Sequence, residues 1–153
     1  MTLYQTQEDE KNEQMLFDKV EGYWPWVYFG WPLGKTCTLD RLGRNRKTDE
    51  ILYVAEGRIR KKMGDRIARM YALPTFIINV GKVRAGLELS LVYGCPYIII
   101  VGWTDFIGYV RVDGINPEWK VAPSKRWVVR CEADKQDVVH IPIGLFRVVG
   151  SNA

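Results

Sequence analysis

Residues 35–60 read KTCTLDRLGRNRKTDEILYVAEGRIR, and this stretch decides the fold class. Its two ends, at 35–42 and 50–60, have the mixed apolar and polar character of half-buried strands. The residues between them, GRNRKTD at 43–49, carry no apolar side chain and predict a turn. We therefore expect an antiparallel β-hairpin, to which the rest of the chain adds further strands and helices.

On the C-terminal side of the hairpin, strand and helix patterns alternate. We expect a buried strand at 75–80, followed by a helix at 82–93 that ends at Gly94. The apolar run CPYIIIVGW at 95–103 is typical of a strand that is buried on both faces. The helix face that we expect to be buried consists of Val83, Leu87 and Leu91.

On the N-terminal side, residues 7–21 predict an amphipathic helix, with acids in its first turns where the helix dipole favours them. The next segment, YWPWVYFGWP at 23–32, contains three tryptophans and two tyrosines. Aromatic side chains at this density can stack on nucleic-acid bases, form a dimer contact or belong to the core. We favour the core.

The order of these elements predicts one α/β domain over residues 1–153, with a central mixed β-sheet flanked by helices. We expect residues 1–6 and 150–153 to be frayed. The remaining expected segments are a helical or irregular stretch at 63–72, a strand at 106–112, a loop at 114–125, and extended segments at 126–132 and 138–146.

The composition excludes several classes of protein. The longest apolar run, at 97–101, is too short to span a bilayer, and the polar start lacks the features of a signal peptide. Three widely spaced cysteines argue against a disulfide scaffold and for a reducing compartment. With a single histidine, a Ser-His triad or a histidine-rich zinc site has little to build on. We therefore expect a cytoplasmic protein that does not contact membranes.

The net charge of +4 is unevenly distributed along the chain. Residues 1–22 carry six acids against two bases, whereas residues 41–69 carry ten Lys or Arg against four acids. This local excess favours a polyanion such as nucleic acid, although a solvated basic surface is the alternative. The residues that we expect to bind nucleic acid are Arg41, Arg44, Arg46, Lys47, Arg60, Lys61 and Lys62.

Asp40 and Glu56 are acids within segments that we expect to be strands. An acid in an apolar strand costs several kcal/mol unless it is paired or bound to a cation. One interpretation is that both point to solvent and pair with arginines. The other is that they hold Mg²⁺, a cation that prefers oxygen ligands, for the hydrolysis of phosphodiester bonds. The residues alone leave both interpretations open.

The run Leu39-Asp40-Arg41-Leu42, followed by Val54-Ala55-Glu56-Gly57-Arg58-Ile59-Arg60, resembles the PD-(D/E)XK nuclease superfamily. In that pattern an acid lies on one hairpin strand and an acid-x-Lys on the next. The chain further resembles a group of small phage-encoded members over about residues 12–149. The supporting segments are Thr75 to Val80, Gly81-Lys82, Gly94-Cys95-Pro96-Tyr97-Ile98-Ile99, and His140-Ile141-Pro142-Ile143-Gly144-Leu145-Phe146.

The resemblance implies a restriction-endonuclease-like fold and a nuclease that cuts DNA with Mg²⁺ or Mn²⁺ in the host cytoplasm. A homodimer is left open. Arg58 and Lys82 would supply positive charge at the catalytic site, beside Asp40 and Glu56. The implied metal ligands are Asp40, Glu56, the carbonyl of Gly57, and Glu13 on the first helix, where Glu10 could serve the same pattern in place of Glu13.

Two positions depart from the superfamily pattern. Leu39 replaces a proline, and Arg58 replaces the lysine of acid-x-Lys. The second change matters more, because a buried lysine can lose its proton whereas arginine stays charged. The alternative function is therefore a catalytically silent, nuclease-derived module that binds nucleic acid or a protein.

Overall fold

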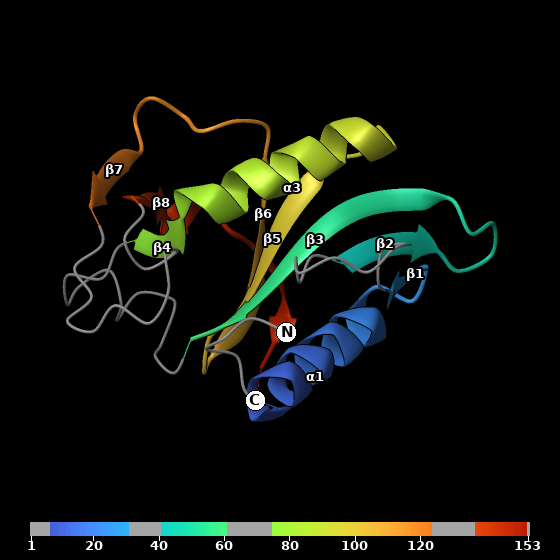
Figure 1. The fold of residues 1–153 in the computed structure, drawn as a ribbon. Coiled ribbons are helices and arrows are strands. Elements are labelled where there is room, and N and C mark those ends of the chain that lie inside the picture. Colours follow the sequence, from blue (N-terminus) through green and yellow to red (C-terminus); the bar gives the residue numbers. More distant parts are fainter. Residues whose placement is uncertain (1–6, 31–40, 61–74, 124–136, 153) are drawn as a thin grey trace.

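The computed structural model describes residues 7–30, 41–60, 75–123 and 137–152. They form two helices, a six-stranded mixed sheet and a three-stranded antiparallel sheet (Figure 1). Neither of these helices is long and apolar enough to cross a membrane. The elements are α1 (Gln7–Tyr23), β1 (Val27–Gly30), β2 (Arg41–Asn45), β3 (Ile51–Ile59), β4 (Thr75–Asn79), α3 (Val80–Tyr93), β5 (Tyr97–Gly102), β6 (Phe106–Val112), β7 (Lys120–Pro123), β8 (Asp137–Pro142), the short 3₁₀ helix η2 (Ile143–Leu145) and β9 (Arg147–Ser151).

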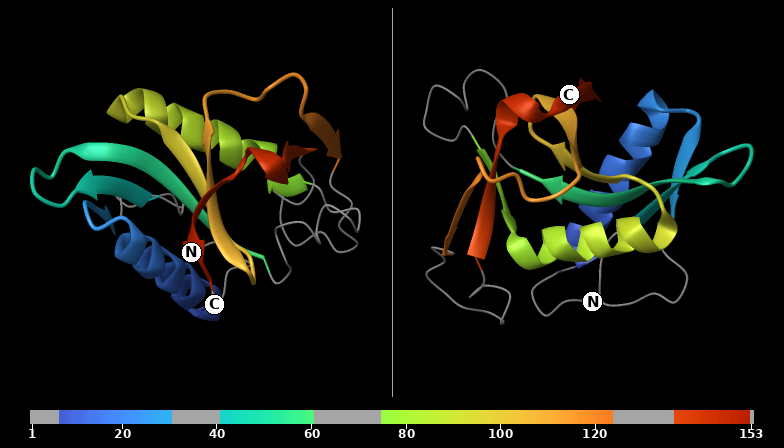
Figure 2. Two further views of the ribbon diagram at one scale, coloured as in Figure 1. Left: turned by 180° about the vertical axis from the view of Figure 1, so that it is seen from behind. Right: turned by 90° about the horizontal axis from the view of Figure 1, so that it is seen from above.

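The six-stranded sheet has the order β1-β2-β3-β5-β6-β9. Neighbouring strands are antiparallel except β3 and β5, which run parallel with Glu56 opposite Ile99. A parallel pair needs a crossover connection, and β4 and α3 lie in that connection. The expected central mixed sheet with flanking helices is confirmed, since α1 covers one face and α3 the other (Figure 1, Figure 2).

β2 and β3 form the antiparallel hairpin that the sequence predicts, with Arg41 opposite Ala55. β3 has nearly the expected bounds, but β2 continues to Asn45, into residues that we expected to be a turn. The cause is a second neighbour, because β1 pairs along β2 from Val27 opposite Asn45 onward. A polar segment becomes a strand when its neighbours satisfy its backbone groups. Residues 35–40 lie outside the described residues.

α1 confirms the helix predicted at the N-terminal side and packs on one face of the six-stranded sheet. Its buried side chains are Leu16, Phe17 and Val20, which contact the β1, β3 and β5 residues of the same core. Among the acids of the helix whose side chains are described, Glu8 and Asp18 are exposed and Glu21 is half-buried, whereas Glu13 is buried. This exception matters for the site described below.

α3 covers the opposite face and has nearly the predicted ends. It is capped by the side chain of Asn79 and ends at Gly94, whose φ of 65° is left-handed. Leu91, which the sequence places on the buried face, is instead 85% exposed. Leu89 and Tyr93, four residues apart, take the core-facing positions in the last turns.

β8 is the central strand of the three-stranded sheet, between β4 and β7. The strand predicted at 75–80 is confirmed as β4, and the extended segment predicted at 138–146 divides into β8 and η2. The loop predicted at 114–125 is wrong in part, because Lys120–Pro123 pair with β8 as β7. After η2 the chain returns to the six-stranded sheet as β9, so this segment ties the two sheets together.

Gly86 of α3 lies directly over Tyr97 of β5, and a Cβ at this position would overlap the phenol ring. Tyr97 is fully buried. We expect Gly86→Ala to lower the free energy of unfolding by about 1–3 kcal/mol, in spite of alanine's higher helix propensity. Urea denaturation measures this change.

Gly22→Ala in α1 is the matched control, because no atom lies within 4 Å of a Cβ added there. It should stabilise the protein by up to about 1 kcal/mol. A Gly86→Ala protein as stable as the wild type would show that α3 does not depend on this close approach.

Candidate active site

β3 places Glu56 and Arg58 on the same face of the sheet, because alternate residues of a strand share a face. This is the face that α3 covers, since Val54 and Ile99, which neighbour Glu56, belong to the α3 core. Glu56 is 1% exposed, and its Oε1 lies 2.6 Å from Nη2 of Arg58. Such a short charge-assisted contact offsets part of the penalty of a buried carboxylate.

Glu13 of α1 is a second buried acid, at 8% exposure. Its pKa is raised from 4.5 to about 7, chiefly by burial and further by the charge of Glu56. The positive charges of Arg58, Arg41 and Lys82 oppose that rise, so all of these groups lie close enough to influence one proton. We call Glu13, Arg41, Glu56, Arg58 and Lys82 the β3 charge cluster.

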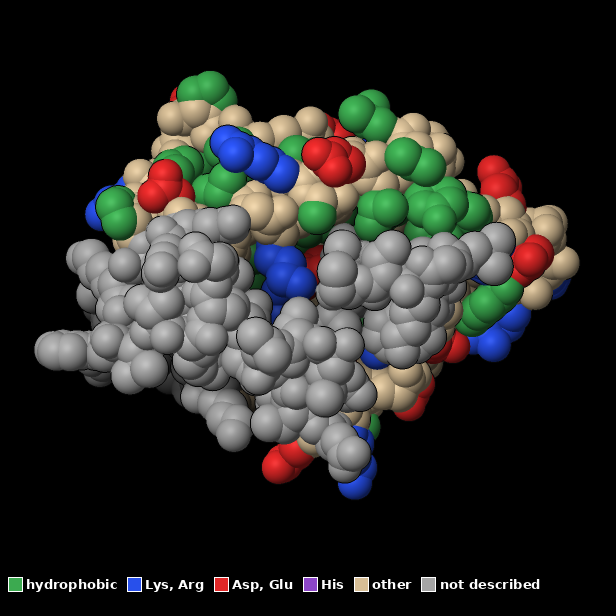
Figure 3. Space-filling view, viewed as in Figure 1, with side chains coloured by type: hydrophobic (Ala, Val, Ile, Leu, Met, Phe, Trp, Pro, Cys, Tyr) green, Lys and Arg blue, Asp and Glu red, His purple; other side chains and the backbone are tan. Residues whose placement is uncertain are grey.

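In the space-filling view, basic and acidic side chains are visible at the bottom of a hollow beneath α3 (Figure 3). The helix above them contributes Lys82 to the cluster from its first turn. Lys82 is partly exposed, and among the described residues it forms no hydrogen bond or ion pair with Glu56. Lys82 therefore contributes to the cluster through its positive charge, which acts on Glu13.

Arg41, which the sequence predicts as a nucleic-acid contact, is 3% exposed. Its Nη1 donates a hydrogen bond to Oε1 of Gln14 (2.5 Å), and its guanidinium lies 4.5 Å from the centre of the Phe17 ring. Arg41 thus joins β2 to α1 from inside the protein. Gln14 was not singled out by the sequence analysis, and its place next to Glu13 in the helix is the only sequence feature that marks it.

Gly57, predicted to offer its carbonyl oxygen to a metal, is buried beneath α1. A Cβ at this position would lie 2.6 Å from a ring carbon of Phe17. Glycine is therefore required for α1 to approach β3 this closely. The backbone of the predicted site is fixed by this contact.

Asp40, predicted as a metal ligand and catalytic acid, lies outside the described residues, as do Lys61 and Lys62. Its chain neighbour Arg41 stands opposite Ala55, which is the chain neighbour of Glu56. Within the described ranges, no group of three or more His, Cys, Asp or Glu is close enough to hold a metal ion. The described part of the site thus offers two carboxyl groups, those of Glu13 and Glu56.

Arg60, also predicted to contact nucleic acid, joins the two sheets. Its Nη2 donates to the carbonyl of Ile77 in β4 (3.0 Å), and its guanidinium lies 4.5 Å from the centre of the Phe76 ring. Burial, together with the charge of Arg58, lowers its pKa from 12.5 to about 10. Even so, Arg60 remains protonated at neutral pH.

Arg44, Arg46 and Lys47 lie at the far end of the β2–β3 hairpin. Glu50, at the start of β3, and Glu56 are six residues apart in an extended strand, or about 20 Å. Arg44 forms an ion pair with Asp49 (3.7 Å). These basic residues and the β3 charge cluster therefore occupy separate places, although the sequence counts them in one basic stretch.

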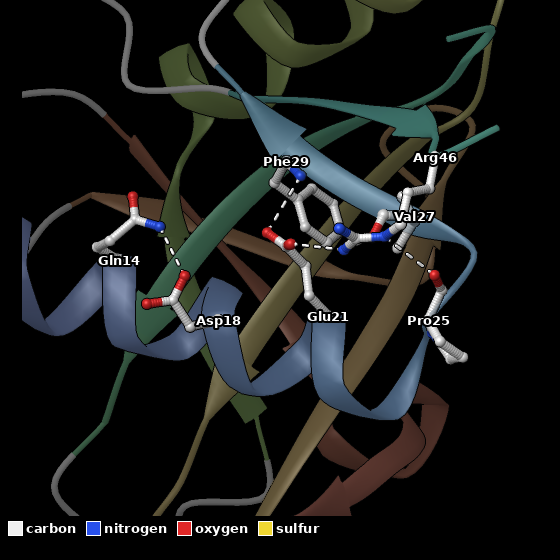
Figure 4. A network of polar contacts seen from close by, with 7 residues as sticks. All are labelled: Gln14, Asp18, Glu21, Pro25, Val27, Phe29 and Arg46. Carbon is white, nitrogen blue, oxygen red and sulfur yellow. Dashed lines mark hydrogen bonds and ion pairs between the residues drawn. The ribbon is translucent and has the colours of Figure 1, made fainter. Parts of the chain in front are cut away.

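Arg46 fixes the loop between α1 and β1 (Figure 4). Its guanidinium donates to the carbonyls of Pro25 (3.1 Å) and Val27 (3.0 Å) and forms an ion pair with Glu21 (2.9 Å). Its backbone nitrogen donates to the carbonyl of Trp26 (2.8 Å). This arginine holds one aromatic turn in place with four separate contacts.

The aromatic segment that includes this turn is divided between core and surface. Val27 and Phe29 are buried, as favoured from the sequence. Tyr23 and Trp26 are 45% and 49% exposed, and Trp26 stacks on Trp24 at 6.0 Å between ring centres. The core interpretation therefore holds for only part of the segment.

A mixed α/β sheet that carries a buried glutamate and, two residues later, a basic partner on its hairpin strand has the arrangement of the PD-(D/E)XK class. The chain belongs to a phage family of that class: a family model described as "Phage putative PDDEXK endonuclease" matches residues 2–149. The resemblance found in the sequence is confirmed by this match. Comparisons with curated proteins and with solved structures find no match.

The buried Glu13 makes the stability of the metal-free protein depend on pH. Because its folded-state pKa lies above the unfolded value, Glu13 stabilises the fold fully below about pH 4.5, and this contribution is lost as the pH rises through 7. Relative to Glu13→Gln, the wild type should lose up to about 3 kcal/mol across this window. Urea unfolding in a chelating buffer on both sides of the window measures the loss.

Glu8→Gln, at an exposed position of the same helix, controls for the removal of one acid from α1. A stability difference between wild type and Glu13→Gln that stays constant with pH would contradict a buried Glu13 that takes up a proton.

Proposed function

We propose that this chain is a nuclease of restriction-endonuclease-like fold that hydrolyses phosphodiester bonds of DNA with Mg²⁺ or Mn²⁺. The observation that carries the proposal is the burial of two carboxyl groups, Glu56 and Glu13, among the basic side chains of the β3 charge cluster. Membership of a phage endonuclease family supports it. We further propose that the protein acts in the host cytoplasm.

The donor set of the site fits a hard divalent cation. Glu56 and Glu13 offer carboxylate oxygens, and the proposed ligands Asp40 and the Gly57 carbonyl would add two more oxygen donors. Carboxylates withdrawn from water favour a cation nearby, and burial raises the pKa of Glu13, so a bound cation would favour the charged form of this carboxyl group. When bound, a divalent ion in such a site supplies an activated water and offsets charge on the phosphate.

The protein's own cations have a separate role in this proposal. Arg58, Arg41 and Lys82 place positive charge around the carboxyl groups, where it stabilises the negative charge that develops on phosphate during hydrolysis. Arg58 cannot take a proton from water, because a guanidinium stays charged. Lys82 is then the side chain of the cluster whose chemistry allows it to assist the attacking water.

The basic residues outside the cluster would hold the DNA. Arg44, Arg46 and Lys47 at the hairpin end, and Lys61 and Lys62 directly after β3, are proposed as phosphate contacts. Lys47 is exposed, and Arg46 is partly exposed in spite of its contacts with the aromatic turn. Such contacts position a duplex without reading its sequence.

The alternative is a catalytically silent module that binds nucleic acid or a protein. The ion pair between Arg58 and Glu56 favours it, because the position that carries lysine in the superfamily pattern is held by a residue that cannot act as a base. The two functions share the fold and the binding surface. They differ in whether the bond is cut.

Removal of a ligand carboxylate should abolish cleavage if the nuclease function is correct. We expect Glu56→Gln and Asp40→Asn each to reduce the cleavage rate by a factor of about 100 or more in Mg²⁺ or Mn²⁺, because the ion loses a charged ligand. The assay uses single-stranded and duplex DNA, with RNA as a further substrate. Glu88→Gln, at an exposed site on α3, is the matched control and should cut at the wild-type rate.

Glu56→Gln that folds and cuts as fast as the wild type would overturn the assignment of the site.

Variants of Lys82 and Arg58 distinguish an active nuclease from a catalytically silent protein. If the chain cuts DNA, Lys82→Met should slow cleavage by a factor of about 10 to 100, because it removes the group that assists the attacking water. If the wild type is inert and Arg58→Lys cuts DNA, the chain is a silenced nuclease and the binding function takes its place. An active wild type that Lys82→Met leaves unchanged would show that Lys82 has no part in the reaction.

A further inference from the structure

The ion pair between Arg58 and Glu56 occupies the carboxylate that is proposed to bind the metal ion. Nη2 of Arg58 lies 2.6 Å from Oε1 of Glu56, slightly closer than the usual distance of about 2.7–2.9 Å for a charge-assisted N–H···O hydrogen bond. The Glu56 side chain is 1% exposed, whereas that of Arg58 is 23% exposed. Arg58 is thus the more exposed member of the pair.

The described charge cluster already contains more cations than anions. Three basic side chains, Arg41, Arg58 and Lys82, act electrostatically on the carboxyl group of Glu13, and Arg58 also pairs with Glu56. Asp40, which lies outside the described residues, would at most make the number of acids equal to the number of cations. Entry of a doubly charged ion into this group adds repulsion with every cation present, and the nearest to Glu56 is Arg58.

Two other arginines of the region have contacts of their own. Arg60 donates to the Ile77 carbonyl, and Arg41 donates to Gln14. Arg58 forms an ion pair with a proposed metal ligand, Glu56. A metal ion that binds Glu56 must therefore compete with one particular side chain, that of Arg58.

We propose that Arg58 is an internal counter-ion of Glu56 that a divalent metal ion must displace, so that Arg58 sets the metal affinity of the site. This inference rests on the proposed metal-dependent function and goes beyond it, because it assigns to the residue in the lysine position control over metal binding. In the ion-free protein the guanidinium neutralises the buried carboxylate. When the ion binds, the guanidinium moves outward, toward the side from which a phosphate group would approach.

The test is calorimetric titration of Mn²⁺ into the intact protein without nucleic acid. We expect Arg58→Met to bind Mn²⁺ at least about tenfold more tightly than the wild type, because the competing charge next to Glu56 is gone. Arg84→Met removes the same charge from an exposed position of α3 and should stay within about twofold of the wild type. Thermal unfolding supplies a second readout: Mn²⁺ should raise the melting temperature of Arg58→Met more than that of the wild type.

Arg58→Lys is the second variant for the Mn²⁺ titration, in case Arg58→Met does not fold without metal. Lysine keeps the charge but lacks the planar fork that fits a carboxylate, so its Mn²⁺ affinity should fall between those of wild type and Arg58→Met. Equal or weaker Mn²⁺ binding by the Arg58 variants would show that guanidinium and metal ion share the carboxylate, which overturns the inference and leaves the nuclease function standing. No Mn²⁺ binding by any of the proteins would overturn the metal site itself, and the inference with it.

Discussion

The parallel pairing of β3 with β5 is the interaction on which the rest of the structure depends. These strands lie in the middle of the six-stranded sheet, and β5 is buried along its whole length. Parallel neighbours cannot be joined by a tight turn, so the chain crosses the sheet between them through β4 and α3. The crossover brings α3 over the face that carries Glu56 and places Lys82 in the β3 charge cluster. The same ladder therefore builds the sheet and assembles the proposed site.

Two glycines determine how closely the helices approach this central pair. Gly57 lets Phe17 of α1 lie against β3, and Gly86 lets α3 lie against Tyr97 of β5. Because both layers come so close, little water reaches the carboxylate of Glu56, and its charge needs a partner within the protein. Arg58 provides one. A well-packed apolar residue at position 56 would be the simpler choice for stability alone, so the buried ion pair is best explained as a requirement of function.

The parts of the fold that follow from local pattern could be predicted from the sequence. The apolar run of β5, the end of α3 at Gly94, and β3 itself carry their signals within a few residues. β7 and the end of β2 do not, because each is a strand only by virtue of a neighbour that is distant in sequence. The prediction that Leu91 is buried was wrong for a related reason. Spacing shows which residues share a helix face, but packing decides which face is buried.

The basic stretch shows most clearly what a count of charges leaves out. Four of its arginines contact other groups of the protein: Arg41 with Gln14, Arg58 with Glu56, Arg60 with β4, and the more exposed Arg46 with the aromatic turn. An arginine with its donors used in this way attracts a polyanion less than an exposed one, because its charge is partly neutralised or its geometry is fixed. In the proposed function, long-range attraction of DNA would come from exposed residues such as Lys47, whereas Arg41 and Arg58 would act only on a phosphate that has reached the β3 charge cluster. The same sequence feature thus divides into one group that concentrates charge at the site and another that holds the fold together.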